Sequence, residues 1–163
     1  IPYKTKESFK KKIIKIVSFL KLKDGILHFQ IKFYKNKIYI IEVTRRIPGD
    51  QYLKFVEYSS AYPVINNVLN IYLNKPLIKK KSKKNNILRK IVMANKNGKY
   101  HSYSISSKLR NNIIYKYDIL KKGDKIYDYL NQRIAIIFLK FSSKQEMIET
   151  SKKINDLFLP KII

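Results

Sequence analysis

The sequence predicts an α+β protein in which an antiparallel sheet with flanking helices is followed by a small second α+β lobe. Three observations lead to this fold class. Residues 26–44 alternate between apolar and polar side chains around a short turn, which predicts a β-hairpin. Segments with helical spacing of apolar residues lie before and after this hairpin. A strongly apolar run at residues 134–141 predicts the central strand of the second lobe.

The first element is a helix over residues 8–20, with Thr5 as the expected N-cap. Its apolar side chains recur at helical spacing, and lysines occupy the other faces of the helix. A basic amphipathic helix can also lie on a membrane surface, but we expect this one to pack on a sheet. The apolar positions are Phe9, Ile13, Ile16, Val17 and Leu20.

The hairpin is predicted from strands at residues 26–33 and 38–44. A one-residue slip would mix its apolar and polar faces, so the hydrophobic pattern predicts one register. In that register Gln30 lies opposite Glu42, which brings two oxygen-bearing side chains together on the polar face. The other predicted pairs are Phe33 with Tyr39, Ile31 with Ile41, Phe29 with Val43 and His28 with Thr44.

The rest of the chain supplies two short helices and the second lobe. Helices are predicted at residues 52–61 and 64–73, and Pro63 separates them. The second lobe should contain four strands and a closing helix that Ser143 and Glu146 cap, at residues 87–94, 100–106, 113–120, 134–141 and 143–158. The predicted domain division is 1–78, a basic linker at 79–86, and 87–163.

The composition is strongly basic, with 36 Lys and Arg against 11 Asp and Glu and a net charge of +25. Such a charge attracts polyanions, including nucleic acid. Lys, Ile, Asn and Tyr are abundant while Arg is scarce, and a bias toward AT-rich codons would raise the lysine count whatever the function. No cysteine, no 18-residue apolar run and no signal peptide are present, and we predict a cytoplasmic protein.

The residues Gln30, Glu42, Thr44 and Arg46 form the candidate site. Magnesium takes oxygen ligands and usually keeps nucleotide phosphates in its shell. A carboxylate beside an amide or hydroxyl oxygen on a rigid hairpin suits this ion, and a nearby arginine supplies charge for phosphates or a substrate carboxylate. A solvated glutamate in a common cross-strand pair is the ordinary alternative.

The run Leu27-His28-Phe29-Gln30, together with the run from Ile40 to Asp50 that contains Glu42-Val43-Thr44-Arg45-Arg46, resembles the ATP-grasp superfamily. The family pattern places an acidic residue or Gln on one strand and Glu-x-Asn-x-Arg about a dozen residues later. Gln30 and Glu42 fit this interval, and Gln at the first position resembles the carbamoyl-phosphate synthetase type. The C-terminal lobe resembles that of the L-amino-acid ligases. The implied fold is the ATP-grasp C-terminal subdomain followed by this lobe.

The resemblance implies a function and a set of roles. ATP and magnesium (or manganese) would be the cofactors of a ligase that phosphorylates a carboxylate to an acylphosphate, which an amine then attacks. Gln30, Glu42 and Thr44 would bind metal. Arg46 would be catalytic and, with Thr44 and Gly49, would contact the nucleotide. Thr44 stands where the family has Asn, so a second metal is an open question.

The resemblance also implies that the chain holds only the metal-bearing half of a nucleotide site. The lobes that hold adenine and substrate would come from missing N-terminal domains or from a partner chain, so this chain alone is expected to be inactive. A homodimer is an open alternative for its assembly. The competing interpretation is a basic nucleic-acid-binding protein without catalysis, such as an organellar ribosomal protein. A ligase should spread its lysines over the surface, whereas a nucleic-acid binder should gather them into a stripe.

Overall fold

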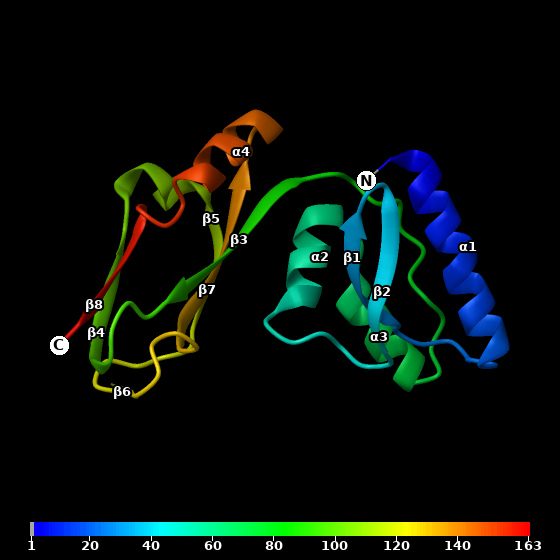
Figure 1. Ribbon diagram of the computed structural model, residues 1–163, viewed down its shortest axis with the longest axis horizontal. Coiled ribbons are helices and arrows are strands. Elements are labelled where there is room, and N and C mark those ends of the chain that lie inside the picture. The colour runs from blue at the N-terminus through cyan, green and yellow to red at the C-terminus, as the bar shows by residue number, and fades with distance from the viewer. Residues whose placement is uncertain (1) are drawn as a thin grey trace. The chain divides into compact units, whose positions relative to one another are not determined.

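The structure, a computed structural model, describes residues 2–163 and divides into two compact units (Figure 1). Unit 1 runs to Gly49 and resumes over Val64–Lys79; unit 2 comprises Asp50–Pro63 and Lys80–Ile163. Residues 50–63 thus pack with the second lobe, whereas the domain division at residues 79–86 stays a prediction. Helices combined with antiparallel sheets confirm the predicted α+β class.

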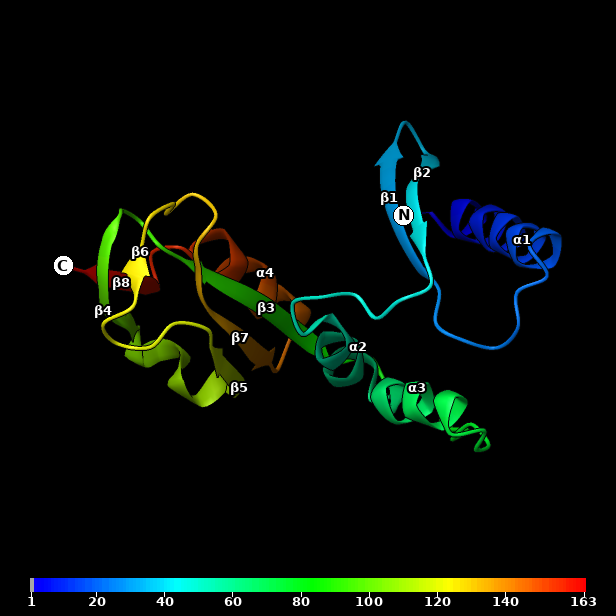
Figure 2. The ribbon, with the colours of Figure 1, turned by 90° about the horizontal axis from the view of Figure 1, so that it is seen from below.

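Unit 1 consists of helix α1 (Tyr3–Phe19), strands β1 (His28–Tyr34) and β2 (Lys37–Thr44), and helix α3 (Val64–Tyr72). The two strands form an antiparallel hairpin, and α1 contacts β2 (Figures 1 and 2). Both predicted strands and both predicted helices of this region are therefore present, with ends that differ from the prediction by a few residues.

Helix α1 begins before its predicted start, and the predicted Thr5 cap is wrong. Pro2 is the N-cap and makes no side-chain hydrogen bond, because the proline ring carries no acceptor. The Thr5 hydroxyl instead donates to the Asn36 carbonyl at 3.2 Å, and Phe9 meets Phe29 edge-on at 5.7 Å, so the helix is tied to the hairpin. Neither α1 nor any other helix within residues 2–163 is long and apolar enough to cross a membrane.

The hairpin keeps the predicted register at its open end and departs from it near the turn. Gln30 lies opposite Glu42, as predicted. Lys35 and Asn36 form a two-residue turn with φ of 44° and 59°, and such a turn fixes the pairing of the residues beside it. That pairing is one residue out of step with the open end, and a β-bulge next to Gln30 absorbs the difference. The predicted pairs Ile31–Ile41 and Phe33–Tyr39 are wrong, and the observed pairs are Ile31–Ile40 and Phe33–Ile38.

Unit 2 holds two three-stranded sheets in the orders β3-β7-β5 and β6-β4-β8. Strand β7 is central in its sheet, as its apolar sequence predicted. The elements are α2 (Tyr52–Ser60), β3 (Asn86–Met93), β4 (Gly98–Ile105), a 3-10 helix (Ser107–Asn112), β5 (Ile113–Asp118), β6 (Lys125–Ile126), β7 (Arg133–Phe141), α4 (Lys144–Lys152) and β8 (Phe158–Ile162).

The core of unit 2 is built around β7, where residues 134–139 are each at most 2% exposed. One face of the strand joins the main hydrophobic cluster, which also contains Tyr100 and Phe158. The other face presents Phe138 to Tyr58 and Tyr115 at ring distances of 5.6 and 5.8 Å. A strand covered on both faces needs a continuous apolar run, which is why this segment was conspicuous in the sequence.

The closing helix is shorter than predicted. Helix α4 ends at Lys152, and the chain then forms strand β8, which pairs with β4. The Ser143 hydroxyl accepts from the Glu146 N–H at 3.1 Å, which confirms half of the predicted capping box. The Glu146 carboxylate accepts from the hydroxyl and N–H of Ser142, at 2.7 and 3.2 Å, instead of from Ser143.

Candidate functional site

The predicted metal-binding residues lie along one face of the β1–β2 hairpin, and Arg46 and Gly49 lie in the loop after β2. Gln30 and Glu42 face each other across the ladder, and both side chains are exposed. Thr44 lies two residues beyond Glu42 and therefore on the same face, opposite His28. Glu42 is the one acidic residue in the two strands. The structure thus brings together an amide oxygen, a carboxylate and a hydroxyl at the open end of the hairpin.

The Thr44 hydroxyl oxygen is buried and has no hydrogen-bond partner among residues 2–163. A buried hydroxyl without a partner costs about 1–3 kcal/mol, so native proteins rarely leave one unsatisfied. This oxygen is therefore suited to a group that the described part of the chain does not supply.

The two adjacent arginines after β2 have different environments. The Arg45 guanidinium donates to the carbonyls of Lys23 and Asp24, both at 3.2 Å, and fixes the loop before β1. The exposed Arg46 guanidinium reaches the Ile47 carbonyl at 3.4 Å and forms no ion pair within the described chain. Arg45 therefore has a structural role, whereas the charge of Arg46 is available to a ligand.

The donor set suits a hard cation that keeps part of its shell for other ligands. Gln30, Glu42 and Thr44 offer only oxygen atoms, which magnesium and manganese accept. Within residues 2–163, no three His, Cys, Asp or Glu side chains gather as a ready-made metal site. Because this donor set contains only one carboxylate, it suits a metal ion whose remaining ligands are phosphate oxygens.

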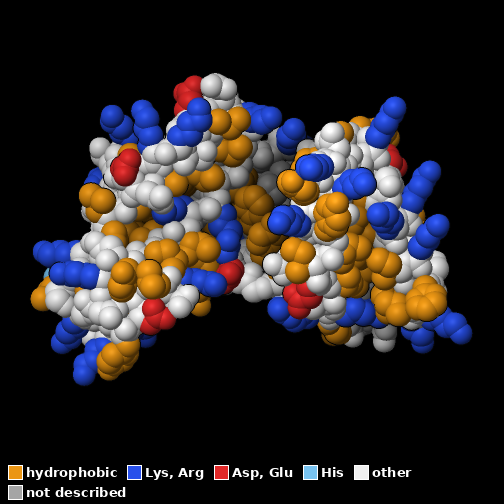
Figure 3. Space-filling model, in the orientation of Figure 1, with side chains coloured by type: hydrophobic (Ala, Val, Ile, Leu, Met, Phe, Trp, Pro, Cys, Tyr) orange, Lys and Arg blue, Asp and Glu red, His pale blue; other side chains and the backbone are white. Residues whose placement is uncertain are grey.

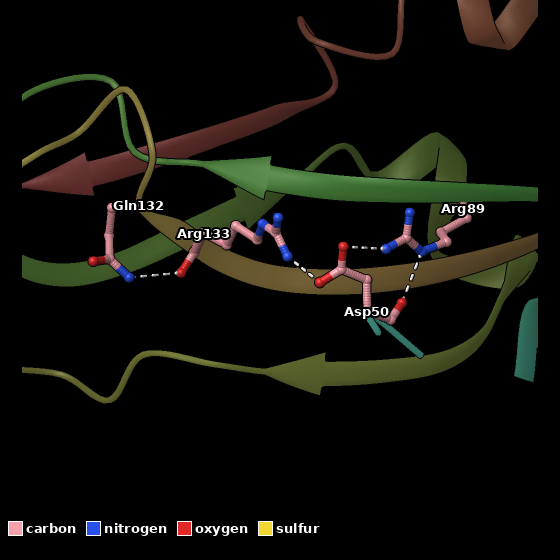
Figure 4. Close-up of polar contacts among 4 residues, drawn as sticks. All are labelled: Asp50, Arg89, Gln132 and Arg133. Carbon is pink, nitrogen blue, oxygen red and sulfur yellow. Dashed lines mark hydrogen bonds and ion pairs between the residues drawn. The ribbon is translucent and has the colours of Figure 1, made fainter. Parts of the chain in front are cut away.

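The loop after Arg46 ends in two residues with contrasting surroundings. A Cβ placed on Gly49 would meet nothing within 4 Å, so open space borders its backbone. Asp50 has φ of 60° and begins unit 2, where its carboxylate lies between two arginines (Figure 4).

Arg89 from β3 and Arg133 from β7 hold Asp50 (Figure 4). The Arg89 Nε donates to the Asp50 carbonyl at 3.0 Å, and its Nη2 lies 3.6 Å from the carboxylate, while Arg133 Nη1 pairs with the other carboxylate oxygen. Sequence reasoning missed both arginines because they lie far from Asp50 in the chain. A signal was available, since arginine is scarce in this lysine-rich sequence and both residues belong to apolar strands.

Lysine and arginine are scattered over the molecular face in Figure 3, on both units, without gathering into one stripe. Acidic side chains on this face are few, as the net charge of +25 requires. On this face the charges do not form the stripe expected of a nucleic-acid binder, so the nucleic-acid-binding alternative is not favoured.

No protein-family model and no curated protein matches this chain. Solved structures do match it over its full length. One is an L-amino acid ligase from Bacillus licheniformis, with a TM-score of 0.82, 18% identity and coverage of 100% of this chain and 42% of the ligase. Another is a phosphoribosylglycinamide synthetase from Anaerococcus prevotii, with a TM-score of 0.81, 18% identity and coverage of 100% and 43%.

A third match is a biotin carboxylase from Campylobacter jejuni, solved as a β-γ-ATP complex, with a TM-score of 0.72, 17% identity and coverage of 100% and 37%. The chain therefore spans about two fifths of the length of these solved structures. All three are ATP-grasp ligases. The chain thus has the fold of the ATP-grasp ligases, which confirms the fold that residues 30–50 predicted.

Proposed function

We propose that this chain is the metal- and phosphate-binding part of an ATP-dependent carboxylate–amine ligase. The pairing of Gln30 with Glu42 at the open end of a hairpin, in a chain with the ATP-grasp ligase fold, carries this proposal. The unsatisfied Thr44 hydroxyl and the free charge of Arg46 support it, because both are suited to groups that the described residues do not provide.

Each residue has a distinct role in this proposal. Gln30, Glu42 and Thr44 hold magnesium or manganese, which when bound neutralises charge on the ATP phosphates. The Arg46 guanidinium stabilises the negative charge of the phosphoryl group during transfer. The open backbone at Gly49 allows a phosphate or substrate group to approach closely. Arg45 positions the loop before β1 and takes no direct part in the reaction.

The proposed reaction has two displacements. A substrate carboxylate oxygen attacks the γ-phosphorus of ATP, the bond to the bridging oxygen breaks, and ADP leaves. The nitrogen of an amine then attacks the acyl carbon, inorganic phosphate leaves with the electrons of its C–O bond, and the nitrogen loses a proton to solvent. Arg46 acts in the first displacement, where charge is spread over the equatorial oxygens of the transferred group.

Binding of adenine and of the carboxylate substrate is assigned to other parts of the enzyme, in a longer chain or a partner chain. The limited core of unit 1 supports this assignment. Among the described residues, Val68 is the only buried hydrophobic side chain in this unit, whereas Ile41 on the hairpin is 60% exposed. Large exposed apolar groups beside a candidate site are typical of a surface that another protein segment covers.

Manganese binding to the chain tests the assignment of Glu42. Mn²⁺ added with ATP should broaden the NMR signals of the His28 ring, because His28 lies opposite Thr44 on the same hairpin face. Glu42→Gln should weaken this effect on the order of tenfold, because it removes the one negatively charged ligand. Glu149→Gln, which removes an exposed carboxylate from α4, is the matched control.

The control separates site binding from general attraction of the cation. Equal weakening by both substitutions would contradict the assignment. His28 broadening that neither substitution changes would also contradict it, since the ion would then bind the imidazole itself.

A further inference from the structure

A hollow of about 440 Å³ lies in unit 2, between strand β4 and strand β5. Its wall on β4 is formed by Tyr100, His101, Ser102 and Tyr103, and its opposite wall by β5 and the loop that follows. This volume falls within the range of small-molecule sites, roughly 300–1,000 Å³. None of its residues takes part in the proposed ATP–metal site, which belongs to unit 1.

The charges around this hollow are unbalanced. Asp118 is the one acidic residue that lines it, and its carboxylate is already engaged by Lys116 at 3.3 Å and by the Tyr103 hydroxyl at 2.8 Å. Lys121 and Lys122 also line the hollow. Neither ammonium group has an ion-pair partner among the described residues, and the nearby Asp124 carboxylate is engaged by the Lys121 backbone N–H at 2.8 Å.

The Tyr103–Asp118 hydrogen bond keeps this imbalance in place. Burial, followed by the hydrogen bond to Asp118, raises the pKa of Tyr103 above its ordinary value of 10.0, so its hydroxyl remains a donor well into the alkaline range. The Asp118 carboxylate therefore remains bound to Tyr103 and Lys116 and does not pair with Lys121 or Lys122. Lys116 also lies over the Tyr103 ring, with Nζ 5.0 Å from the ring centre, which holds this lysine at the wall of the hollow.

Polar donors other than lysine also border the hollow. The His101 ring Nδ1 lies 3.1 Å from the Ser102 hydroxyl, so an imidazole and a hydroxyl are adjacent on one wall. Strand β5 is at the edge of its sheet, and β4 pairs with β6 only at Gly98 and Lys99 within the described residues. Beyond Lys99, Tyr100 still exchanges backbone hydrogen bonds with Gly123 and Asp124, and no strand pairs with the rest of this side of β4 among the described residues.

The donor chemistry favours phosphate over carboxylate. Arginine is the side chain that matches a planar carboxylate with two parallel hydrogen bonds, and no arginine lines this hollow. Lysine binds phosphate as a compact point charge with three donors. Two lysines beside a hydroxyl and an imidazole therefore match a doubly charged tetrahedral anion.

We propose that this hollow binds the phosphate group of a small phosphorylated molecule, through Lys121, Lys122, His101 and Ser102. The site is a second anion site of the chain, beyond the one in the proposed ligase reaction. Lys116, Asp118 and Tyr103 form part of its wall and are already paired with one another, so they are not assigned to the anion.

NMR titration of the full chain with inorganic phosphate tests this proposal. The chain has two histidines, His28 and His101, so their ring signals report on the two units separately. At constant pH and ionic strength and without added metal, phosphate should shift the His101 signals with saturation at a Kd of about 1 mM or tighter, while the His28 signals report separately on the anion site of unit 1. Lys121→Gln combined with Lys122→Gln should weaken binding by about tenfold, because it removes both unpaired charges.

The matched control is Lys80→Gln combined with Lys81→Gln, which removes two adjacent exposed lysines of unit 2 outside the hollow. It should leave phosphate binding unchanged. Three results would overturn the proposal: equal weakening by both double substitutions, a linear His101 shift without saturation, or a response to an oligonucleotide but not to phosphate. None of these bears on the manganese experiment, so the two proposals succeed or fail separately.

Discussion

The two units differ in how much of their apolar surface they bury. In unit 2, six consecutive residues of β7 are at most 2% exposed, and two hydrophobic clusters form on the faces of this strand. In unit 1, Val68 is the only buried hydrophobic side chain among the described residues, while Phe19 is 84% and Ile41 is 60% exposed. The candidate ATP–metal residues therefore belong to the unit with the smaller core.

The stability of the chain and the geometry of the candidate site therefore depend on different units. A two-stranded hairpin alone is marginally stable in water. The β1–β2 hairpin depends on a few contacts at its surface, including the Phe9–Phe29 ring contact and the hydrogen bond from Thr5 to Asn36. We therefore expect the unfolding free energy to respond mainly to unit 2, and metal binding mainly to unit 1.

The largest expected effect comes from Phe138→Ala in the core of unit 2. Phe138 is fully buried between the rings of Tyr58 and Tyr115, so truncation should lower the free energy of unfolding by about 3–5 kcal/mol. Ile41→Ala in unit 1 should change it by no more than about 0.5 kcal/mol, because the side chain is mostly exposed. Urea denaturation followed by circular dichroism measures both, and equal losses would contradict the contrast between the units.

A smaller effect is expected from two matched glycine substitutions. Gly98 in unit 2 has φ of 142°, and a Cβ there would lie 2.6 Å from the Ile163 carbonyl oxygen, which already accepts from the Lys99 N–H. Gly98→Ala should therefore cost about 1–3 kcal/mol, since the carbonyl cannot move away without losing its hydrogen bond. Gly49→Ala in unit 1 should be close to neutral, because nothing lies within 4 Å of its Cβ position.

Thermal unfolding of the two alanine variants checks this second contrast. A clear loss of stability for Gly98→Ala and none for Gly49→Ala would support the difference between the units. The opposite order would mean that the loop after Arg46 is more constrained than the open space beside Gly49 indicates.

Local patterns predicted the elements whose side-chain periodicity is strong. The alternation in β1 and β2, the apolar run of β7 and the capping residue Ser143 all carry their signal within a few residues. Strand β8 was missed because the predicted helix ran to Phe158, where β8 begins, and no element was predicted for the residues after it. Its strand state comes from pairing with β4, which lies more than fifty residues away in sequence.

In the candidate site, too, some features follow from local sequence patterns and others do not. The pairing of Gln30 with Glu42 follows from the hydrophobic pattern of the two strands, which is local. The bulge next to Gln30 does not follow from that pattern, because it reconciles the strand register with the separate demand of the turn at Lys35 and Asn36. The contacts of Asp50 with Arg89 and Arg133 could not be predicted from the sequence either, because only the folded sheet brings these residues together.

The smallest expected effect concerns helix capping, in which the units also differ. Helix α1 of unit 1 has no side-chain cap and no acidic residue in its first turn, whereas the Ser143 side chain caps α4 of unit 2 and Glu146 lies in the first turn of that helix. The hydrogen bond from the Ser142 hydroxyl holds the pKa of Glu146 below its ordinary value of 4.5. The folded state therefore binds a proton at Glu146 less readily than the unfolded state does.

It follows that Glu146 contributes stability at pH values above 4.5, and that this contribution is lost as the pH falls through the lower pKa of the folded state. Glu146→Gln should lower the urea midpoint at neutral pH, and the difference from the original chain should shrink as the pH falls below this value. Glu149→Gln on the same helix controls for the loss of a carboxylate. If the difference in urea midpoint between Glu146→Gln and the original chain did not change with pH, the effect would come from the packing of α4. The charge of Glu146 would then not contribute to the difference in helix capping between the two units.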